Sequence, residues 1–221
     1  MRKLQLTLAA AALVFAASCG NTPNNDVVNA DSAKEVSTPS AASVTYNVDN
    51  AATTIEWKGS KITGSAHNGT IALKDGSIVN VENGAVTGGK FVFDLNSLNP
   101  TDQDAENNGK LKGHLLAPDF LDVEKFADAY FVITEVKAGA PAESKLANAT
   151  HTVTGNLTLK GTEKSITFPA IINVTDADVT TQADFTFDRT QWGIVYGTDK
   201  SLGDNLINND IEIKLNVKAT K

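Results

Sequence analysis

The sequence has very little cysteine: Cys19 is the only one among 221 residues. A single thiol cannot form an intramolecular disulfide or a Cys-x-x-Cys redox pair. The chain therefore lacks the covalent cross-links that stabilise many small exported domains. We expect its folded part to be stabilised by packing.

Motifs of the large enzyme classes are also absent. The sequence contains no HExxH, GxSxG or GxGxxG, the fingerprints of zinc proteases, α/β-hydrolases and dinucleotide-binding enzymes. Residues 84–91, GAVTGGKF, have the spacing of a phosphate-binding loop, but Phe91 stands where that loop needs Ser or Thr. We interpret them as a glycine-containing hairpin. The motifs predict no catalytic residue and no cofactor, and they favour a protein that is not an enzyme.

The first 19 residues have the pattern of an export signal. Arg2 and Lys3 precede an apolar run over residues 4–15, and Ala-Ala-Ser at 16–18 precedes Cys19. This arrangement resembles the lipobox of bacterial lipoproteins, whose cysteine is acylated and becomes the mature N-terminus. It predicts a signal peptide over residues 1–18 and a membrane anchor on Cys19. The alternative is an ordinary signal peptide with an incidental cysteine.

The lipobox pattern also predicts a location. We expect the protein in the bacterial cell envelope, with its folded part in the periplasm or at the cell surface. Gly20 follows the cysteine, in place of the aspartate that retains some lipoproteins at the inner membrane. This favours the outer membrane.

Basic residues are fewer than acidic ones. The chain has 19 Lys and Arg against 26 Asp and Glu, a formal net charge of -7. Without Arg2 and Lys3, 17 basic residues face 26 acidic ones, which gives -9. An acidic surface repels nucleic acid and anionic lipid headgroups. We therefore expect neither as a partner.

Residues 20–43 contain no aromatic residue and are rich in Asn, Ser, Ala and Pro. A segment of this composition buries too little apolar surface to fold by itself. We predict that residues 19–43 form a lipidated flexible tether. Residues 44–221 then form the folded part, whose length suits one domain.

The dominant hydrophobic period of residues 44–221 is two. In the clearest example, DIEIKLNVKA, apolar Ile211, Ile213, Leu215 and Val217 alternate with polar residues, as in a strand with one buried face. Similar runs separated by turn residues occur along the domain, and no repeated βαβ pattern appears. We predict an all-β antiparallel sheet of about eight strands, folded as a closed barrel or a sandwich.

Residues 101–126 depart from this period. Leu111 and Leu115 are four residues apart, and Pro118 with Asp119 suits the start of a helix. Two glycines in the first half weaken a single long helix. We predict a short helical insert of two pieces, joined at residues 117–118 and lying across the sheet or its open end.

Five segments together resemble the YceI-like family: SAHNGT (65–70), GGKFVFDLNSL (88–98), KLKGHLLAPDFLDVEKFADAYFVIT (110–134), VTGNLTLKG (153–161) and FTFDRTQWGIVYG (185–197). They occur in order, and the resemblance runs from about residue 46 to residue 219. It implies a closed antiparallel lipocalin-like barrel of about eight strands with a short helical insert. It also implies that the elongated apolar interior binds a polyisoprenoid, such as a quinone tail, or a related lipid.

The candidate ligand-binding residues are aromatic or aliphatic. Seven point inward on the expected register: Phe91, Phe93, Phe131, Ile133, Phe168, Phe185 and Phe187. Phe120, Leu121 and Phe126 of the insert are expected to cover an apolar opening, and Trp192 and Tyr196 to lie near the ligand. The same pattern suits an ordinary filled core. A filled barrel that acts as an interaction module is therefore an open alternative.

A second alternative is a metal-dependent or hydrolytic envelope enzyme that uses His67, His114 and His151. Three imidazoles and a water suffice for catalytic zinc. No two of these histidines have the spacing of one strand face or one helix face, so we predict no metal site. Their simpler roles are a turn at His67, an anchor for the insert at His114 and an exposed strand start at His151. For Arg189 we expect an ion pair with a carboxylate.

Overall fold

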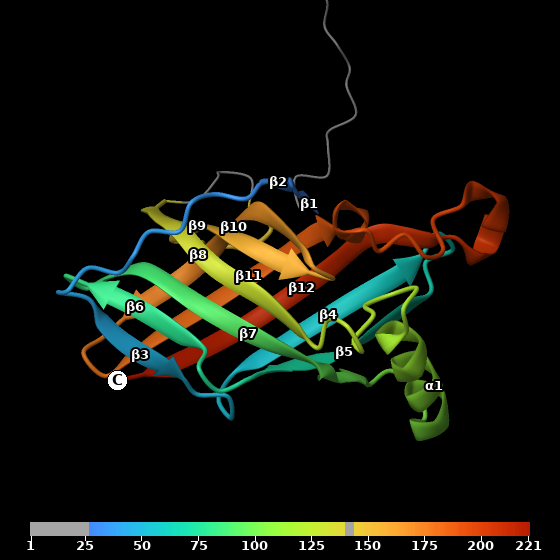
Figure 1. Ribbon diagram of the computed structural model, residues 1–221, viewed down its shortest axis with the longest axis horizontal. Helices are drawn as coiled ribbons and strands as arrows, with labels where there is room; N and C mark the ends of the chain where they lie inside the picture. The colour runs from blue at the N-terminus through green and yellow to red at the C-terminus, as the bar shows by residue number, and fades with distance from the viewer. Residues whose placement is uncertain (1–26, 140–143) are drawn as a thin grey trace, which may run out of the picture.

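In the computed structural model, which describes residues 27–139 and 144–221, eight strands close into an antiparallel barrel (Figure 1). In pairing order they are β11 (Asp178–Asp188), β10 (Thr162–Val174), β9 (His151–Leu159), β8 (Asp128–Ala138), β7 (Ala85–Pro100), β5 (Ala66–Leu73), β4 (Thr54–Lys61) and β12 (Ile207–Thr220). Strands β11 and β12 close the barrel through a continuous ladder from Asp178 opposite Thr220 to Asp188 opposite Asp210. The predicted closed barrel is confirmed, and the sandwich is excluded.

Two short strands, β3 (Val44–Val48) and β6 (Ile78–Glu82), complete the wall at one end of the barrel. They pair with each other, β3 also pairs with the end of β12, and β6 with the start of β7. Tyr46 on β3 is buried, and its hydroxyl donates to the carbonyl of Thr175, 3.1 Å away. We call this the closed end. The opposite end, where β4 reaches Lys61 and β12 begins, is the mouth.

The period-two pattern of the last strand gives the register directly. Ile211, Ile213, Leu215 and Val217 of β12 all face the barrel interior. Lys214, between them, points outward and lies 3.7 Å from Asp184 on β11. The alternation predicted from the sequence is confirmed.

The N-terminal segment fills a gap in the wall. Strands β10 and β11 pair only between residues 170–174 and 179–183, and they separate towards the mouth. There β1 (Val27–Val28) pairs with β11 and β2 (Asp31–Ser32) pairs with β10. Val28 and Ala30 pack against the hydrophobic core.

The prediction of a flexible tether over residues 19–43 is therefore wrong for residues 27–32. Composition correctly indicates that this segment buries little apolar surface of its own. It does not show that two separated strands leave free backbone groups, with which a short extended segment can pair. Residues 1–26, including the predicted signal peptide and Cys19, lie outside the described residues.

Asn156 on β9 holds the next part of this segment. Its side-chain amide donates to the carbonyl of Lys34 over 2.7 Å, and its oxygen accepts from the Lys34 N–H over 2.9 Å. We expect Asn156→Ala to cost about 1–3 kcal/mol and to accelerate hydrogen exchange over residues 28–36, because both bonds are lost. The control is Asn173→Ala, at an exposed position of β10. Unchanged exchange over residues 28–36 would contradict this role of Asn156.

The predicted insert contains one helix, α1 (Ala105–Leu116), rather than two. Asp104 caps its start by accepting from the N–H of Asn107 over 2.8 Å, and the helix ends at Ala117 because Pro118 disfavours a helical residue before it. The second predicted piece is wrong: residues 117–126 form turns, with Asp122 in a left-handed conformation. No helix among the described residues has the length and hydropathy of a membrane span.

The turn expected at residues 67–69 is also wrong, since these residues belong to β5. Gly69 is needed there for a different reason. A Cβ atom at this position would lie 2.2 Å from the carbonyl oxygen of Asn99 on β7. An Asn-Gly pair suits both a tight turn and such a close approach of two strands, so the dipeptide alone does not distinguish them.

Candidate functional site: an apolar cavity in the barrel

The barrel encloses an elongated cavity of about 590 Å³ that runs from the closed end to the mouth. All eight barrel strands and α1 contribute to its walls, which are mostly aliphatic and aromatic. Among the described residues, no Asp or Glu lines it. The volume lies within the range of small-molecule sites. The filled-barrel alternative is therefore not supported.

Ten of the twelve residues predicted to bind a ligand line this cavity: Phe91, Phe93, Phe120, Leu121, Phe131, Ile133, Phe168, Phe185, Phe187 and Tyr196. The other two do not. Phe126 packs against the β9–β10 turn, at Gly161. Trp192 is buried in the wall, where its indole N–H donates to the carbonyl of Leu157 over 3.0 Å. Apolar character predicts burial, but it does not predict on which side of the wall a side chain is buried.

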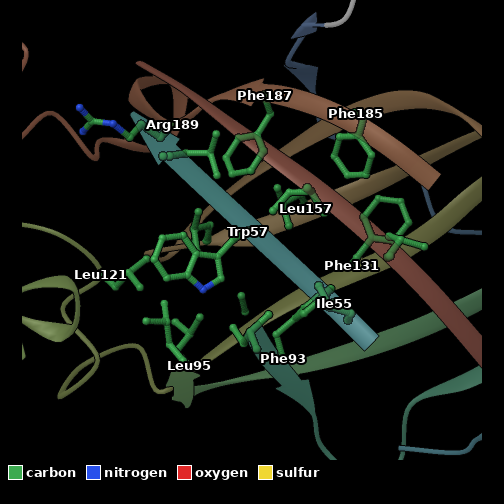
Figure 2. A pocket seen from close by; sticks show the side chains of 18 of the residues that line it. Ile55, Trp57, Phe93, Leu95, Leu121, Phe131, Leu157, Phe185, Phe187 and Arg189 are labelled. Carbon is green, nitrogen blue, oxygen red and sulfur yellow. The ribbon is translucent and has the colours of Figure 1, made fainter. Parts of the chain in front are cut away.

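Aromatic rings form a row along one wall of the cavity. Phe168 stacks on Phe185 with ring centroids 4.3 Å apart, and Phe131 contacts Phe168 at 5.5 Å. Phe131 and Phe168 come from β8 and β10, with β9 between them. Their contact depends on Gly155 of β9, because a Cβ atom there would lie 2.3 Å from the Phe131 ring. Figure 2 shows Phe131 and Phe185 projecting into the cavity.

Several lining residues were missed by the sequence analysis. Ile55 and Trp57 of β4 face the cavity, as does Leu157 of β9 (Figure 2). Leu111 of α1 also lines it. The sequence contains the pattern that could have identified the two β4 residues, because Ile55 and Trp57 alternate with polar residues in TIEWKGSK. The inward face of β12 was recognised as a strand pattern, but it was not assigned to the site.

Polar lining residues gather at the mouth: Ser60, Lys61, Ser65, His67, His114, Arg189, Tyr196 and Asn205. Deeper in the barrel the walls are apolar, apart from Thr181. The cavity therefore has an apolar body and one polar end. This arrangement suits an amphipathic ligand whose long apolar part enters first.

One hydrogen-bonded pair at the mouth involves His67. Its Nδ1 lies 2.8 Å from Oδ2 of Asp102, whose other oxygen accepts from the N–H of Asn68 over 3.1 Å. Burial alone raises the pKa of Asp102, but these hydrogen bonds outweigh it and lower the pKa below its usual value. Asp102 thus carries a fixed negative charge beside the mouth.

Arg189 is 2% exposed and makes no ion pair within the described residues, contrary to expectation. Its guanidinium donates instead to the carbonyls of Ile194, Tyr196 and Asn208, at 2.6, 2.9 and 3.2 Å. Burial lowers the pKa of Arg189, and nearby Asp188 opposes this. The guanidinium also lies over the ring of Phe120, 5.7 Å from the ring centroid, at the edge of the cavity (Figure 2). Arg189 therefore holds the loop beside the mouth.

The three histidines do not converge. His67 contacts Asp102, His114 lies 3.3 Å from Asp119, and His151 starts β9 beside Thr150. Among the described residues, no group of three or more His, Cys, Asp and Glu could hold a metal ion. The three-imidazole site is therefore absent from this part of the chain. The predicted hydrogen bond of His114 joins α1 to the next turn of the insert at Asp119, and a ring contact with Tyr196 links the insert to the loop beside the mouth.

Residues 117–126 cover one side of the mouth. Phe120 contacts the rings of His114 and Tyr196, each at 5.1 Å, and Lys160 donates to the carbonyl of Pro118 over 2.9 Å. Leu121 lines the cavity beside them. The segment is thus fixed to both α1 and the β9–β10 turn.

We expect Leu121→Ala to weaken binding of a fluorescent isoprenoid about tenfold, because it removes apolar contact from the cavity wall. Stopped-flow release of the probe measures this. Val123→Ala is the control, since Val123 packs against the core but does not line the cavity. Equal effects of the two substitutions on release would argue against a covering role for Leu121.

Known protein sequences show which family this chain belongs to. The sequence profile described as the YceI-like domain matches residues 46–219. The chain belongs to the YceI-like family. A UPF0312 protein of Pseudomonas putida is 33% identical over 119 residues, which are 54% of this chain and 56% of that protein. A UPF0312 protein of Pseudomonas fluorescens is 43% identical over 67 residues, 30% of this chain and 31% of that one. The matches thus span about half the length of these relatives or less.

Solved structures share the YceI-like fold at low sequence identity. BcnA of Burkholderia cenocepacia superposes with a TM-score of 0.59 and 18% identity, covering 78% of this chain and 99% of BcnA. A polyisoprenoid binding domain from Saccharophagus degradans, implicated in plant cell wall breakdown, has a TM-score of 0.56 and 16% identity. The superposition covers 79% of this chain and 97% of that domain. Both support the lipocalin-like barrel as the fold.

Proposed function

We propose that this protein binds a long apolar lipid, of the polyisoprenoid or quinone type, inside the barrel and catalyses no reaction on it. The observation that carries the proposal is the elongated apolar cavity with polar groups at one end. Each buried CH₂ contributes ~0.8 kcal/mol, so a chain along this cavity binds without strong polar contacts. The polyisoprenoid binding domain from Saccharophagus degradans supports the same ligand class.

The groups at the mouth support binding rather than catalysis. Asp102 accepts hydrogen bonds from both His67 and Asn68, and the Arg189 guanidinium donates to backbone carbonyls. General acid–base chemistry needs a positioned proton donor or acceptor that faces the substrate. The imidazoles of His67 and His114 line the mouth, but each lies within hydrogen-bond distance of a carboxylate of the protein, and no Asp, Glu, Lys or His of the described residues lines the apolar body of the cavity.

Native mass spectrometry of the freshly purified protein tests the proposal. We expect a co-purified lipid mass that is lost from Ile211→Trp, because Ile211 lines the cavity and a larger side chain there blocks the chain's path. Lys214→Trp, on the outward face of the same strand, should retain the lipid. A bound metal, or no lipid in the wild-type protein even after incubation with an isoprenoid, would overturn the proposal.

The same proposal includes a membrane anchor at Cys19 and a location in the bacterial cell envelope, with the outer membrane favoured. Acylation requires the Cys19 thiol, so Cys19→Ser should move the protein from the detergent-extracted membrane fraction to a soluble or unprocessed form. Cell fractionation with immunoblotting measures this. A processed, mature-size Cys19→Ser protein that stayed on the membrane would contradict the anchor.

A further inference from the structure

Large apolar side chains that stay exposed gather at the mouth of the barrel. Four of them, which we call the apolar rim, lie in the loops there: Ile62, Val195, Tyr196 and Leu202. Ile62 and Val195 are 61% and 57% exposed. Single exposed apolar residues are ordinary, but a group around one opening indicates an interaction site.

Two loops carry the rim, and backbone hydrogen bonds join them. The N–H of Ile62, after β4, donates to the carbonyl of Leu206 over 3.0 Å, and the N–H of Ile207 donates to the carbonyl of Gly197 over 2.8 Å. The second loop contains two 3-10 helices, η1 (Arg189–Trp192) and η2 (Lys200–Asn205). It extends beyond the ends of β4 and β12, at the right of Figure 1. The four rim residues therefore belong to one end of the molecule.

The rim continues into the cavity. Tyr196 is 42% exposed and also lines the cavity wall, where its ring lies 4.6 Å from that of His114. An apolar chain that leaves the cavity beside Tyr196 thus meets further apolar surface.

The charge of the rim loops differs from that of the whole chain. Residues 61–65 and 193–206 contain Lys61 and Lys200 against Asp199 and Asp204, so these loops have no net charge. The chain as a whole carries -7. A neutral apolar surface on an acidic protein suits a zwitterionic lipid surface, because anionic headgroups repel the rest of the molecule.

Strand β1 lies near this end of the barrel. Val27 pairs with Thr186, three residues before Arg189. Cys19 precedes Val27 by eight residues, which span at most about 28 Å when extended. An acyl group on Cys19 would therefore keep the mouth within a short distance of the membrane.

We propose that the apolar rim inserts into a zwitterionic bilayer surface, so that the cavity opens directly onto the membrane that holds its ligand. This inference rests on the proposed function, and it adds the route by which the ligand enters. Ile62, Val195 and Leu202 bury their side chains among the lipid headgroups and upper acyl chains, with Tyr196 at the boundary between lipid and cavity.

Insertion depth tests the inference without any ligand. The full chain carrying Ile62→Cys or Val44→Cys is labelled with an environment-sensitive fluorophore and bound to phosphatidylcholine vesicles that contain spin-labelled lipid. Val44 is an exposed apolar residue of β3, at the closed end. The unsubstituted chain, taken through the same labelling, reports any signal from Cys19. We expect strong quenching at position 62 and little at position 44. Equal quenching at the two positions would overturn the inference. So would a label at position 62 that is shielded by a second copy of the protein and is not quenched by the lipid.

Ligand uptake separates this inference from the proposed function. Ile62→Asp with Leu202→Asp should slow uptake of a fluorescent farnesyl probe from phosphatidylcholine vesicles by about tenfold, because charged side chains oppose insertion. Affinity for probe delivered from cyclodextrin should stay unchanged, since neither residue lines the cavity. The matched control is Val36→Asp with Val44→Asp. Equal uptake by both double variants would overturn the proposed role of the apolar rim. No binding from cyclodextrin by the wild-type chain would instead overturn the proposed function.

Discussion

Ile213→Asp should cost roughly 3–5 kcal/mol of the free energy of unfolding, as expected for an uncompensated charge placed in an apolar interior. Ile213 lies on β12 between Phe185 of β11 and Trp57 of β4, and all three line the cavity. An aspartate there finds no cation among the neighbours that face it. Urea unfolding of the purified protein measures the loss.

Lys214→Asp is the matched control, since this residue is next along the strand and faces water. It exchanges the 3.7 Å contact with Asp184 for a like charge opposite Asp184 and Glu56, which water screens at this exposed position, and it should cost about 1 kcal/mol. Similar damage from both substitutions would contradict the inward and outward faces of β12.

The loss of unfolding free energy in Ile213→Asp should also depend on pH. Burial raises the pKa of the new carboxyl in the folded state above the ~3.9 of an unfolded chain. The folded protein then binds the proton more tightly, so the variant's deficit is greatest at neutral pH and shrinks as the pH falls towards the unfolded value. The difference between Ile213→Asp and Lys214→Asp, measured from pH 7 to pH 4, isolates this effect from other carboxylates.

Arg189→Met should destabilise the protein by about 3 kcal/mol or more, because it leaves buried carbonyls without donors. The carbonyls of Ile194, Tyr196 and Asn208 lie on the loop beside the mouth and at the start of β12. Hydrogen exchange over residues 193–207 should rise more than exchange in the barrel strands. Urea unfolding and exchange mass spectrometry together measure both effects.

Two further substitutions make this prediction specific. Arg189→Lys should recover less than half of the loss, since an ammonium presents its donors from one point and cannot reach carbonyls on both sides. Gln191→Met, at an exposed neighbour in the same 3-10 helix, should change stability by less than about 0.5 kcal/mol. A fully stable Arg189→Met protein would show that water replaces the guanidinium at these carbonyls.

The antiparallel strands could be predicted because their pattern is local, whereas the choice of a closed barrel over a sandwich came from the resemblance to the YceI-like family. In β12, Ile211 to Val217 alternate with polar residues, and a strand with one apolar face needs other such strands to cover it. Most of the predicted aromatic residues line the cavity for the same reason. Phe126 and Trp192 show the limit, because an apolar side chain can be buried on either side of a closed wall.

The sequence by itself determined the period-two strands, the presence of a helical insert between two of them, and the apolar character of the interior, since each depends on residues near one another in the chain. Only the tertiary structure decided that residues 27–32 fill the gap between β10 and β11, that Arg189 binds carbonyls instead of a carboxylate, and that the interior is hollow. These features depend on groups brought together from distant positions. Whether a wall of inward side chains leaves a cavity depends on how widely the closed barrel separates them, which no local pattern specifies.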